Sequence, residues 1–171
     1  MKAREITLSA VILAFALTAF VIESQLPSLI PIPGFKIGLS NIFTLALLYL
    51  WDRKHCFIIL LLRIFIGSFI YGSGIAFLYS FTGGMVCFAV MSILKTFFGE
   101  DGILVVSMSG ALAHNIGQLF MAAFVLKSGA VFVYLPILCA VGIASGLFVG
   151  VIGRICIKNT HIRKLMSGEL Q

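Results

Sequence analysis

The sequence predicts an all-α integral membrane protein, a single domain over residues 1–171 that forms a compact bundle of six transmembrane helices. Two observations predict this class. Hydrophobic residues make up 61% of the chain and charged residues only 11%, whereas a water-soluble domain carries roughly a quarter charged residues. Long apolar runs also alternate with short breaks along the whole chain. In lipid such runs must be helical, because each segment has to satisfy its own backbone hydrogen bonds.

The predicted spans follow one another with only short breaks between them. We expect them at residues 6–23, 37–51, 56–71, 75–98, 103–126 and 130–157. The breaks are rich in Gly, Pro or charged residues, which are typical of turns. The first span follows two basic residues and resembles a signal peptide, but no small-x-small cleavage site precedes Glu23, so we expect a retained helix.

The basic residues are distributed unevenly between the two ends of these spans. With the N-terminus inside, nine of them lie at the cytoplasmic face: Lys2, Arg4, Arg53, Lys54, Lys95, Arg154, Lys158, Arg163 and Lys164. Only Lys36 and Lys127 lie outside. Cytoplasmic loops of membrane proteins carry an excess of Lys and Arg. We therefore expect a multi-pass protein of the bacterial inner membrane with both termini in the cytoplasm.

Several classes of partner find no support in the sequence. The net charge is +6, but no basic run interleaved with aromatic residues indicates nucleic acid. The four cysteines lie singly in apolar stretches, which is typical of core thiols rather than of a metal site or disulfide framework. We therefore expect neither a metal nor a cofactor.

Catalysis also lacks a convincing constellation. Ser109 and His114 lie five residues apart on one predicted helix, so they project about 140° apart and cannot form a nucleophile–base pair. No P-loop and no Asp-rich motif for a magnesium-bound diphosphate occurs in the sequence. We expect a protein that is not an enzyme and does not itself use ATP.

Arg63 lies about halfway through the third predicted span. A charge at that depth costs a few kcal/mol, so the side chain should face the bundle interior and find a partner. On the outer side, the acidic residue that lies in or beside a predicted span is Glu23, at the end of the first span. Arg63 can therefore be half of a structural ion pair or a counter-charge for an anionic ligand.

Polar side chains concentrate in the fifth span and in the second. Ser107, Gly110, His114 and Gln118 share one helical face, with Asn115 beside it. Adjacent polar groups at mid-membrane depth are expensive and indicate a polar cavity, although a network of interhelical hydrogen bonds would also account for them.

The second and fourth spans add further polar or flexible positions to the outer half of the bundle. The second contributes Ser40, Asn41 and Thr44. The fourth contributes Ser80 and a Gly83–Gly84 pair, which we expect to be flexible.

Two helices carry stripes of small residues, which allow close helix–helix approach. On the first span the stripe contains Ala10 and Ala14, flanked by Thr7 and Thr18, and serves either internal packing or docking of a membrane partner. On the last span Gly142, Gly146 and Gly150 repeat every four residues, with Gly153 close by, and internal packing is the favoured interpretation.

The quoted residues carry a resemblance to a known family. The stretches "LPSLIPIPGFKIGLSNIFTLALLYLWD", "RIFIGSFIYG", "YSFTGG" and "SGALAHNIGQL" resemble the bacterial Gx transporter family, often labelled heptaprenyl diphosphate synthase component I. The PGxKxGLxN and AHNxGQ elements are the specific ones. The resemblance covers nearly the whole chain.

That family is similar to the substrate-binding S components of energy-coupling factor (ECF) transporters. These are compact six-helix proteins that dock on a membrane T component, driven by cytoplasmic ATPases, through an AxxxA strip on the first helix. The resemblance implies this role for Ala10 and Ala14, and the role of a substrate lid for the first outer loop, where Pro31, Pro33 and Gly34 lie.

The expected function is therefore capture of a small organic solute from outside for ATP-driven transport by partner subunits. The alternative is a membrane accessory of heptaprenyl diphosphate or menaquinone biosynthesis, as the family label suggests. The basic groups favour an anionic or polar aromatic ligand. We expect the following residues to bind it: Lys36, Ser40, Asn41, Arg63, His114, Asn115 and Gln118.

Overall fold

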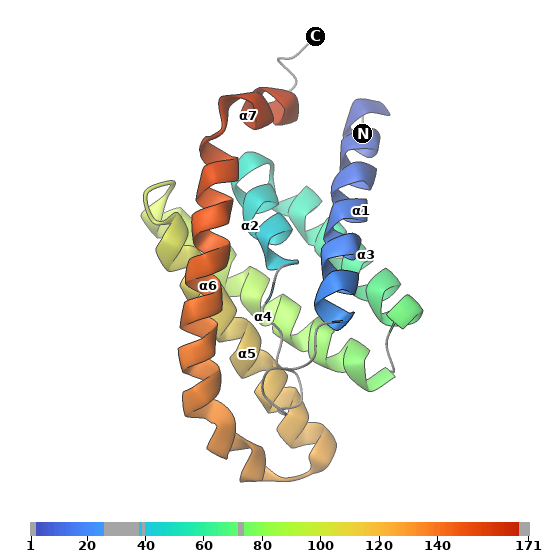
Figure 1. Ribbon diagram of the computed structural model, residues 1–171, viewed down its shortest axis with the longest axis vertical. Coiled ribbons are helices and arrows are strands. Elements are labelled where there is room, and N and C mark those ends of the chain that lie inside the picture. Colours follow the sequence, from blue (N-terminus) through green and yellow to red (C-terminus); the bar gives the residue numbers. More distant parts are fainter. Residues whose placement is uncertain (1–2, 26–37, 39, 72–73, 168–171) are drawn as a thin grey trace.

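The computed structural model describes residues 3–25, 38, 40–71 and 74–167, and in this part of the chain all regular structure is helical. Its elements are α1 (Ala3–Gln25), α2 (Asn41–Leu50), α3 (Arg53–Tyr71), α4 (Gly74–Phe98), α5 (Ile103–Leu126), the 3-10 helix η1 (Gly129–Tyr134), α6 (Leu135–Lys158) and α7 (Thr160–Ser167). The prediction of an all-α fold is confirmed for the described residues (Figure 1).

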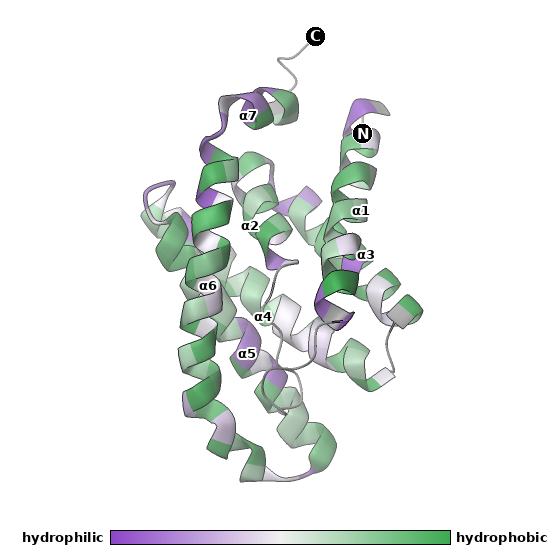
Figure 2. Ribbon diagram, in the orientation of Figure 1, coloured by the Kyte–Doolittle hydropathy of each residue, from purple (hydrophilic) through white to green (hydrophobic). Residues whose placement is uncertain are grey.

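Among the described residues, four stretches are long and apolar enough to cross a membrane. They are Arg4–Glu23, Gly74–Phe98, Ile103–Leu126 and Gly129–Lys158, of which the last joins η1 to α6. Large apolar side chains on their outer faces are exposed, among them Phe97 and Phe124. Figure 2 shows hydrophobic residues along most of α4 and α6, whereas α7 is largely hydrophilic. A continuous apolar exterior of this kind fits a lipid environment, so the prediction of a membrane protein is supported.

The second predicted span differs from the structure. Its helix, α2, begins only at Asn41 and has 10 residues, which corresponds to a length of about 15 Å, half of the hydrocarbon thickness. Helix α3 has 19 residues but starts with Arg53 and Lys54 and contains Arg63. It is not among the four candidate membrane-spanning stretches. The crossing count of six therefore stays a prediction.

Helix α5 is the centre of the bundle and packs most extensively against α4 and α6. Glycines make this close approach possible. A Cβ on Gly146 of α6 would lie 2.6 Å from the Met108 Cα of α5, and a Cβ on Gly117 would lie 3.1 Å from the Thr82 carbonyl oxygen of α4. The glycine ridge of the last span therefore packs inside the bundle, as predicted.

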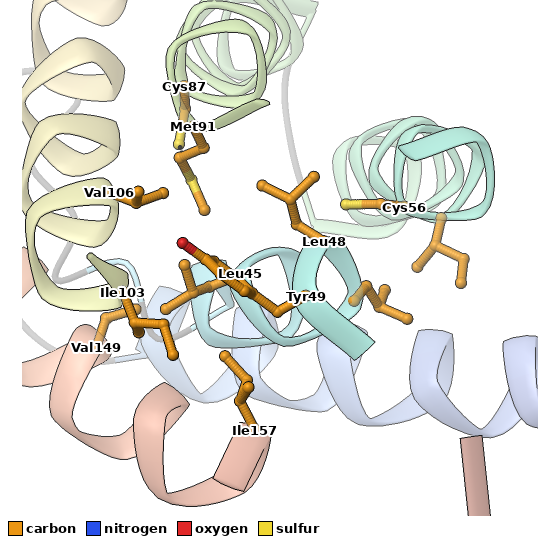
Figure 3. Packing of buried hydrophobic residues seen from close by; sticks show 12 residues of the cluster. Leu45, Leu48, Tyr49, Cys56, Cys87, Met91, Ile103, Val106, Val149 and Ile157 are labelled. Atoms are coloured by element: carbon orange, nitrogen blue, oxygen red, sulfur yellow. Dashed lines mark hydrogen bonds between the residues drawn. The ribbon is translucent and has the colours of Figure 1, made fainter. Parts of the chain in front are cut away.

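A hydrophobic core surrounds the short α2 (Figure 3). Leu45 and Leu48 of α2 are fully buried, and residues of α3, α4, α5 and α6 close around them. The Cys56 thiol lies in this core and donates to the Thr44 carbonyl, with a sulfur–oxygen distance of 3.3 Å. Cys87 is also buried there, whereas Cys139 and Cys156 are half-buried. Burial of this cluster fixes α2 against α6.

The two ends of the described chain lie at the same end of the bundle (Figure 1). Arg4 of α1 donates from Nη2 to the Leu165 carbonyl of α7, over 2.8 Å. Arg163 of α7 forms an ion pair with Glu100, in the turn between α4 and α5. The helix α7, which the sequence analysis did not predict, thus joins α1 to that turn. Which side of the membrane this end faces stays a prediction.

Candidate functional site

Six of the seven predicted ligand-binding residues fall in the described part of the chain, and all six are buried. They are Ser40, Asn41, Arg63, His114, Asn115 and Gln118. The seventh, Lys36, lies outside the described residues, as do Pro31, Pro33 and Gly34 of the predicted lid. Figure 2 shows hydrophilic segments at the end of α1, at the beginning of α2 and halfway along α5.

Two adjoining pockets bring most of these residues together. The Arg63 pocket is lined by Phe20, Glu23, Gly38, Ser40, Asn41, Arg63, Ile64, Ser80 and His114. The Met91 pocket is lined by Gly38, Asn41, Cys87, Met91, Ser107, Ala111, His114, Asn115, Ser145 and Val149. The pockets share Gly38, Asn41 and His114, so these three residues separate them.

The guanidinium of Arg63 lies in the bundle interior. Its Nη1 donates to Oδ1 of Asn41 over 3.5 Å, which is a long contact for a hydrogen bond. The Glu23 carboxylate lies in the wall of the same pocket. Two opposite charges are therefore placed in one pocket wall, contributed by the end of α1 and the middle of α3.

Glu23 and Gly38 connect α1 to the beginning of α2. The backbone N–H of Gly38 donates to Oε1 of Glu23, and the Gly38 carbonyl accepts from the N–H of Asn41 over 2.9 Å. Gly38 has φ +83°, which an L-residue with a side chain adopts only at a cost. A side chain at this position would also crowd Asn41, because a Cβ on Gly38 would lie 3.1 Å from Nδ2 of Asn41.

The polar residues of α5 divide between the pockets and helix packing. Asn115 lines the Met91 pocket, but its Nδ2 also donates to the Leu138 carbonyl of α6 over 2.9 Å. Ser107 donates to the Gly146 carbonyl over 2.7 Å. Gln118 lines neither of the two pockets. Both alternatives drawn from the sequence, a polar cavity and a network between helices, are therefore realised in the described residues.

Gly83 and Gly84, the pair expected to be flexible, lie at the packed interface of α4 with its neighbours. Both are buried inside the continuous helix α4. A Cβ on Gly83 would lie 2.8 Å from Cγ of Gln118 and 3.0 Å from the His114 carbonyl oxygen, and one on Gly84 would lie 2.9 Å from Cδ1 of Ile64. Gly83 thus lets α4 approach the polar face of α5, and the pair serves packing.

Some pocket residues were not among the predicted ligand-binding residues. Glu23 was considered only as a partner of Arg63, and Ser80 only as a nearby polar group. Phe20 and Ser145 gave no signal, since an aromatic residue or a serine in an apolar helix is common. The helical register does place Phe20 one turn before Glu23 on the same face.

The predicted docking strip lies on the outside of the bundle. Thr7, Ala10, Ala14 and Thr18 are all exposed, and α1 packs mainly against α3. The Thr18 hydroxyl donates to the Ala14 carbonyl over 2.9 Å, which satisfies it within its own helix. The strip therefore presents small side chains away from the bundle, and packing within the described chain does not explain it.

Comparison with known proteins gives one positive finding. A search of curated proteins and a search of solved structures found no match to the chain. A family model, described as heptaprenyl diphosphate synthase component I, matches residues 12–156. This range includes the docking strip from Ala14 onward and every residue that lines the two pockets. The chain therefore belongs to the heptaprenyl diphosphate synthase component I family.

Proposed function

We propose that this chain is the membrane-embedded substrate-binding component of an ECF-like transporter. It captures a small organic solute from outside, and partner subunits supply the ATP-driven transport step. The observation that carries the proposal is the pair of polar pockets inside an apolar bundle. Polar groups buried in lipid are expensive and are typical of substrate pathways, and pockets for small molecules are mostly apolar with a few polar groups that fix orientation.

The position of the Arg63 pocket supports uptake from one side. Glu23 lies at the end of α1 remote from the N-terminus, and Ser80 lies in the second turn of α4, near the same end. His114 lies halfway along α5. Met91 and Ser107 place the Met91 pocket toward the end of the bundle that holds the chain termini, whereas the Arg63 pocket extends from mid-bundle toward the opposite end. With the termini in the cytoplasm of a bacterial cell, this opposite end lies in the outer half of the inner membrane.

The exposed strip on α1 supports docking on a membrane T component. Alanines on a lipid-facing helix allow another helix to approach closely, and dispersion contacts then drive association. The partner subunits would be this T component and two cytoplasmic ATPases. The chain itself is proposed to bind its solute without chemical conversion.

The test combines mass spectrometry and co-purification. The chain is purified from membranes of its host and examined by native mass spectrometry for a retained small molecule, and its co-purified proteins are identified. A retained solute together with a T component and ATPases supports the proposal. A chain that retains no small molecule and associates with none of these subunits contradicts it.

A second function is favoured by the family description itself. In this alternative the chain is a membrane accessory of heptaprenyl diphosphate or menaquinone biosynthesis. The same purification separates the two proposals, because the accessory role predicts a soluble prenyl diphosphate synthase among the co-purified proteins and no ATPases.

A further inference from the structure

Only one of the two carboxylate oxygens of Glu23 accepts a hydrogen bond from a described residue. The residue is 6% exposed, and its Oε1 accepts from the N–H of Gly38. Its Oε2 is buried and has no hydrogen-bond partner among the described residues. A buried carboxylate oxygen without a donor is costly, because it has lost its water and gained nothing in exchange. Such an atom needs an explanation.

The pocket offers one, because Glu23 lines the Arg63 pocket. No ion pair joins Glu23 to Arg63 in the described part of the chain, so the two charged groups line the pocket without direct contact. A carboxylate oxygen and a guanidinium thus line one small space. The described wall of this pocket carries one negative and one positive side chain. This balance does not favour the anionic ligand that was expected from the basic residues in the sequence.

We propose that Glu23 is a specificity-determining residue for the solute, an inference that rests on the proposed function. The ligand presents an N–H or O–H donor to Oε2 of Glu23 and an acceptor group to Arg63, and Phe20 covers its apolar part. The ligand class is therefore a zwitterionic or amide-like organic solute with donor and acceptor side by side. Inorganic phosphate, diphosphate and prenyl diphosphates do not belong to it.

The exclusion of phosphates follows from the same geometry. A multiply charged anion beside Arg63 would also lie close to the Glu23 carboxylate. Repulsion between like charges is strong where water is excluded and the local dielectric constant is low. An uncharged or zwitterionic ligand avoids this repulsion and provides Oε2 with its missing donor.

Variants of Glu23 separate ligand recognition from an anchoring role. In Glu23→Gln the amide oxygen can still accept from Gly38, while the second position becomes an NH₂ donor, the opposite of what the ligand needs. Glu23→Ala loses both contacts. If Glu23 recognises the ligand, both variants retain the native solute at least about tenfold less well. If it only anchors Gly38, Glu23→Gln retains the solute like the unaltered protein.

Ser92→Ala is the matched control. The Ser92 hydroxyl is also buried without a hydrogen-bond partner among the described residues, but Ser92 lines neither pocket. Its removal should leave retention unchanged. Each protein is first checked for folding by thermal unfolding in detergent.

Two measurements on the unaltered protein decide the question if Glu23→Gln does not fold. The solute released from it is weighed in light and heavy water, which counts its exchangeable N–H and O–H hydrogens, and inorganic diphosphate is offered as a competitor. At least one exchangeable hydrogen and no displacement by diphosphate are expected. A solute without such hydrogens, or displacement by diphosphate, overturns the inference and leaves the transport proposal standing. Absence of any retained solute instead contradicts the proposed function.

Discussion

Asp52 shows how a single side chain stabilises the beginning of a helix. Its Oδ1 accepts from the His55 backbone N–H over 2.7 Å, and its Oδ2 contacts the His55 ring nitrogen Nδ1 over 2.8 Å. The side chain therefore caps the beginning of α3 directly after α2 ends. Partial burial acts to raise the pKa of Asp52, but the hydrogen bonds from His55 outweigh it and the pKa is lowered.

We predict that Asp52→Ala lowers the free energy of unfolding by about 1 kcal/mol at neutral pH, the usual cost of a lost N-cap. Because the folded-state pKa is depressed, this contribution is present above the unfolded pKa of about 3.9 and is lost as the pH falls through the folded value. Thermal unfolding of both proteins in detergent, from pH 7 to pH 3, checks this. A difference that persists undiminished at pH 3 would contradict the capping role.

Asn41 and His114 are the residues whose removal should affect the ligand most directly, since they line both pockets. We expect Asn41→Ala and His114→Ala each to weaken retention of the native solute on the order of ten- to a hundredfold, the effect of one lost hydrogen bond in a dry site. Binding is measured on protein shown to be folded by thermal unfolding. Unchanged affinity in both variants would assign them to helix packing.

At the scale of elements, the contact between α5 and α6 depends on glycines that leave no room for a side chain. The Cβ of a residue at position 146 would lie 2.6 Å from the Met108 Cα and 3.0 Å from the Ser107 carbonyl oxygen. Backbone atoms cannot give way as a flexible side chain can. The two helices would have to separate.

We predict that Gly146→Val destabilises the protein by about 1–3 kcal/mol, the typical cost of overpacking. Gly129→Val is the control, because a Cβ there meets nothing within 4 Å. Both are compared with the unaltered protein by thermal unfolding in the same detergent. Equal stability of the two variants would show that α5 and α6 are less closely packed than described.

The success of the sequence predictions differed between elements for physical reasons. Hydropathy and small-residue spacing correctly predicted α4, α5 and the glycine ridge of α6, because these features depend on local composition and helical period. The apolar run 37–51 gave no sign that the helix begins only at Asn41. That beginning depends on the turn at Gly38 and its bond to Glu23, a contact 15 residues apart in the chain.

The pocket was predictable only in part for the same reason. Buried polar side chains such as Asn41, Arg63 and His114 are conspicuous in an apolar sequence, and the structure brings them together. Phe20 and Ser145 are ordinary in composition, and only the packing of the helices places them at the pockets. Gln118 has the polarity of a ligand-binding residue, but it lies against the position where Gly83 lacks a side chain.

At the scale of the whole molecule, the shared end of α1 and α7 constrains topology. We predict that a cysteine replacing Ser128 reacts with an impermeant maleimide in intact cells, and that one replacing His161 reacts only after permeabilisation. The experiment uses a background whose four native cysteines are replaced by alanine. The reverse pattern would overturn the orientation inferred from the basic residues.

Docking on a partner also belongs to the whole molecule. We predict that Ala10→Leu combined with Ala14→Leu abolishes co-purification of the T component and leaves solute retention intact, because bulky side chains keep the partner helix at a distance. Val151→Leu, at an exposed position of α6, is the control and should retain the partner. Loss of both properties in the double variant would assign the strip to folding.

Helix α1 carries the docking strip near one end and Glu23 near the other, separated by the 13 residues from Ala10 to Glu23, which corresponds to about 20 Å of rigid helix. Any solute that changes the position of Glu23 therefore also moves the docking strip, the surface that the partner binds. Thermodynamic reciprocity then applies, so the factor by which the solute changes partner affinity equals the factor by which the partner changes solute affinity. A partner that binds the strip more tightly when the pocket is occupied must raise the solute affinity by the same factor, through slower dissociation or faster association. A partner that binds the empty form more tightly must lower the solute affinity by the same factor.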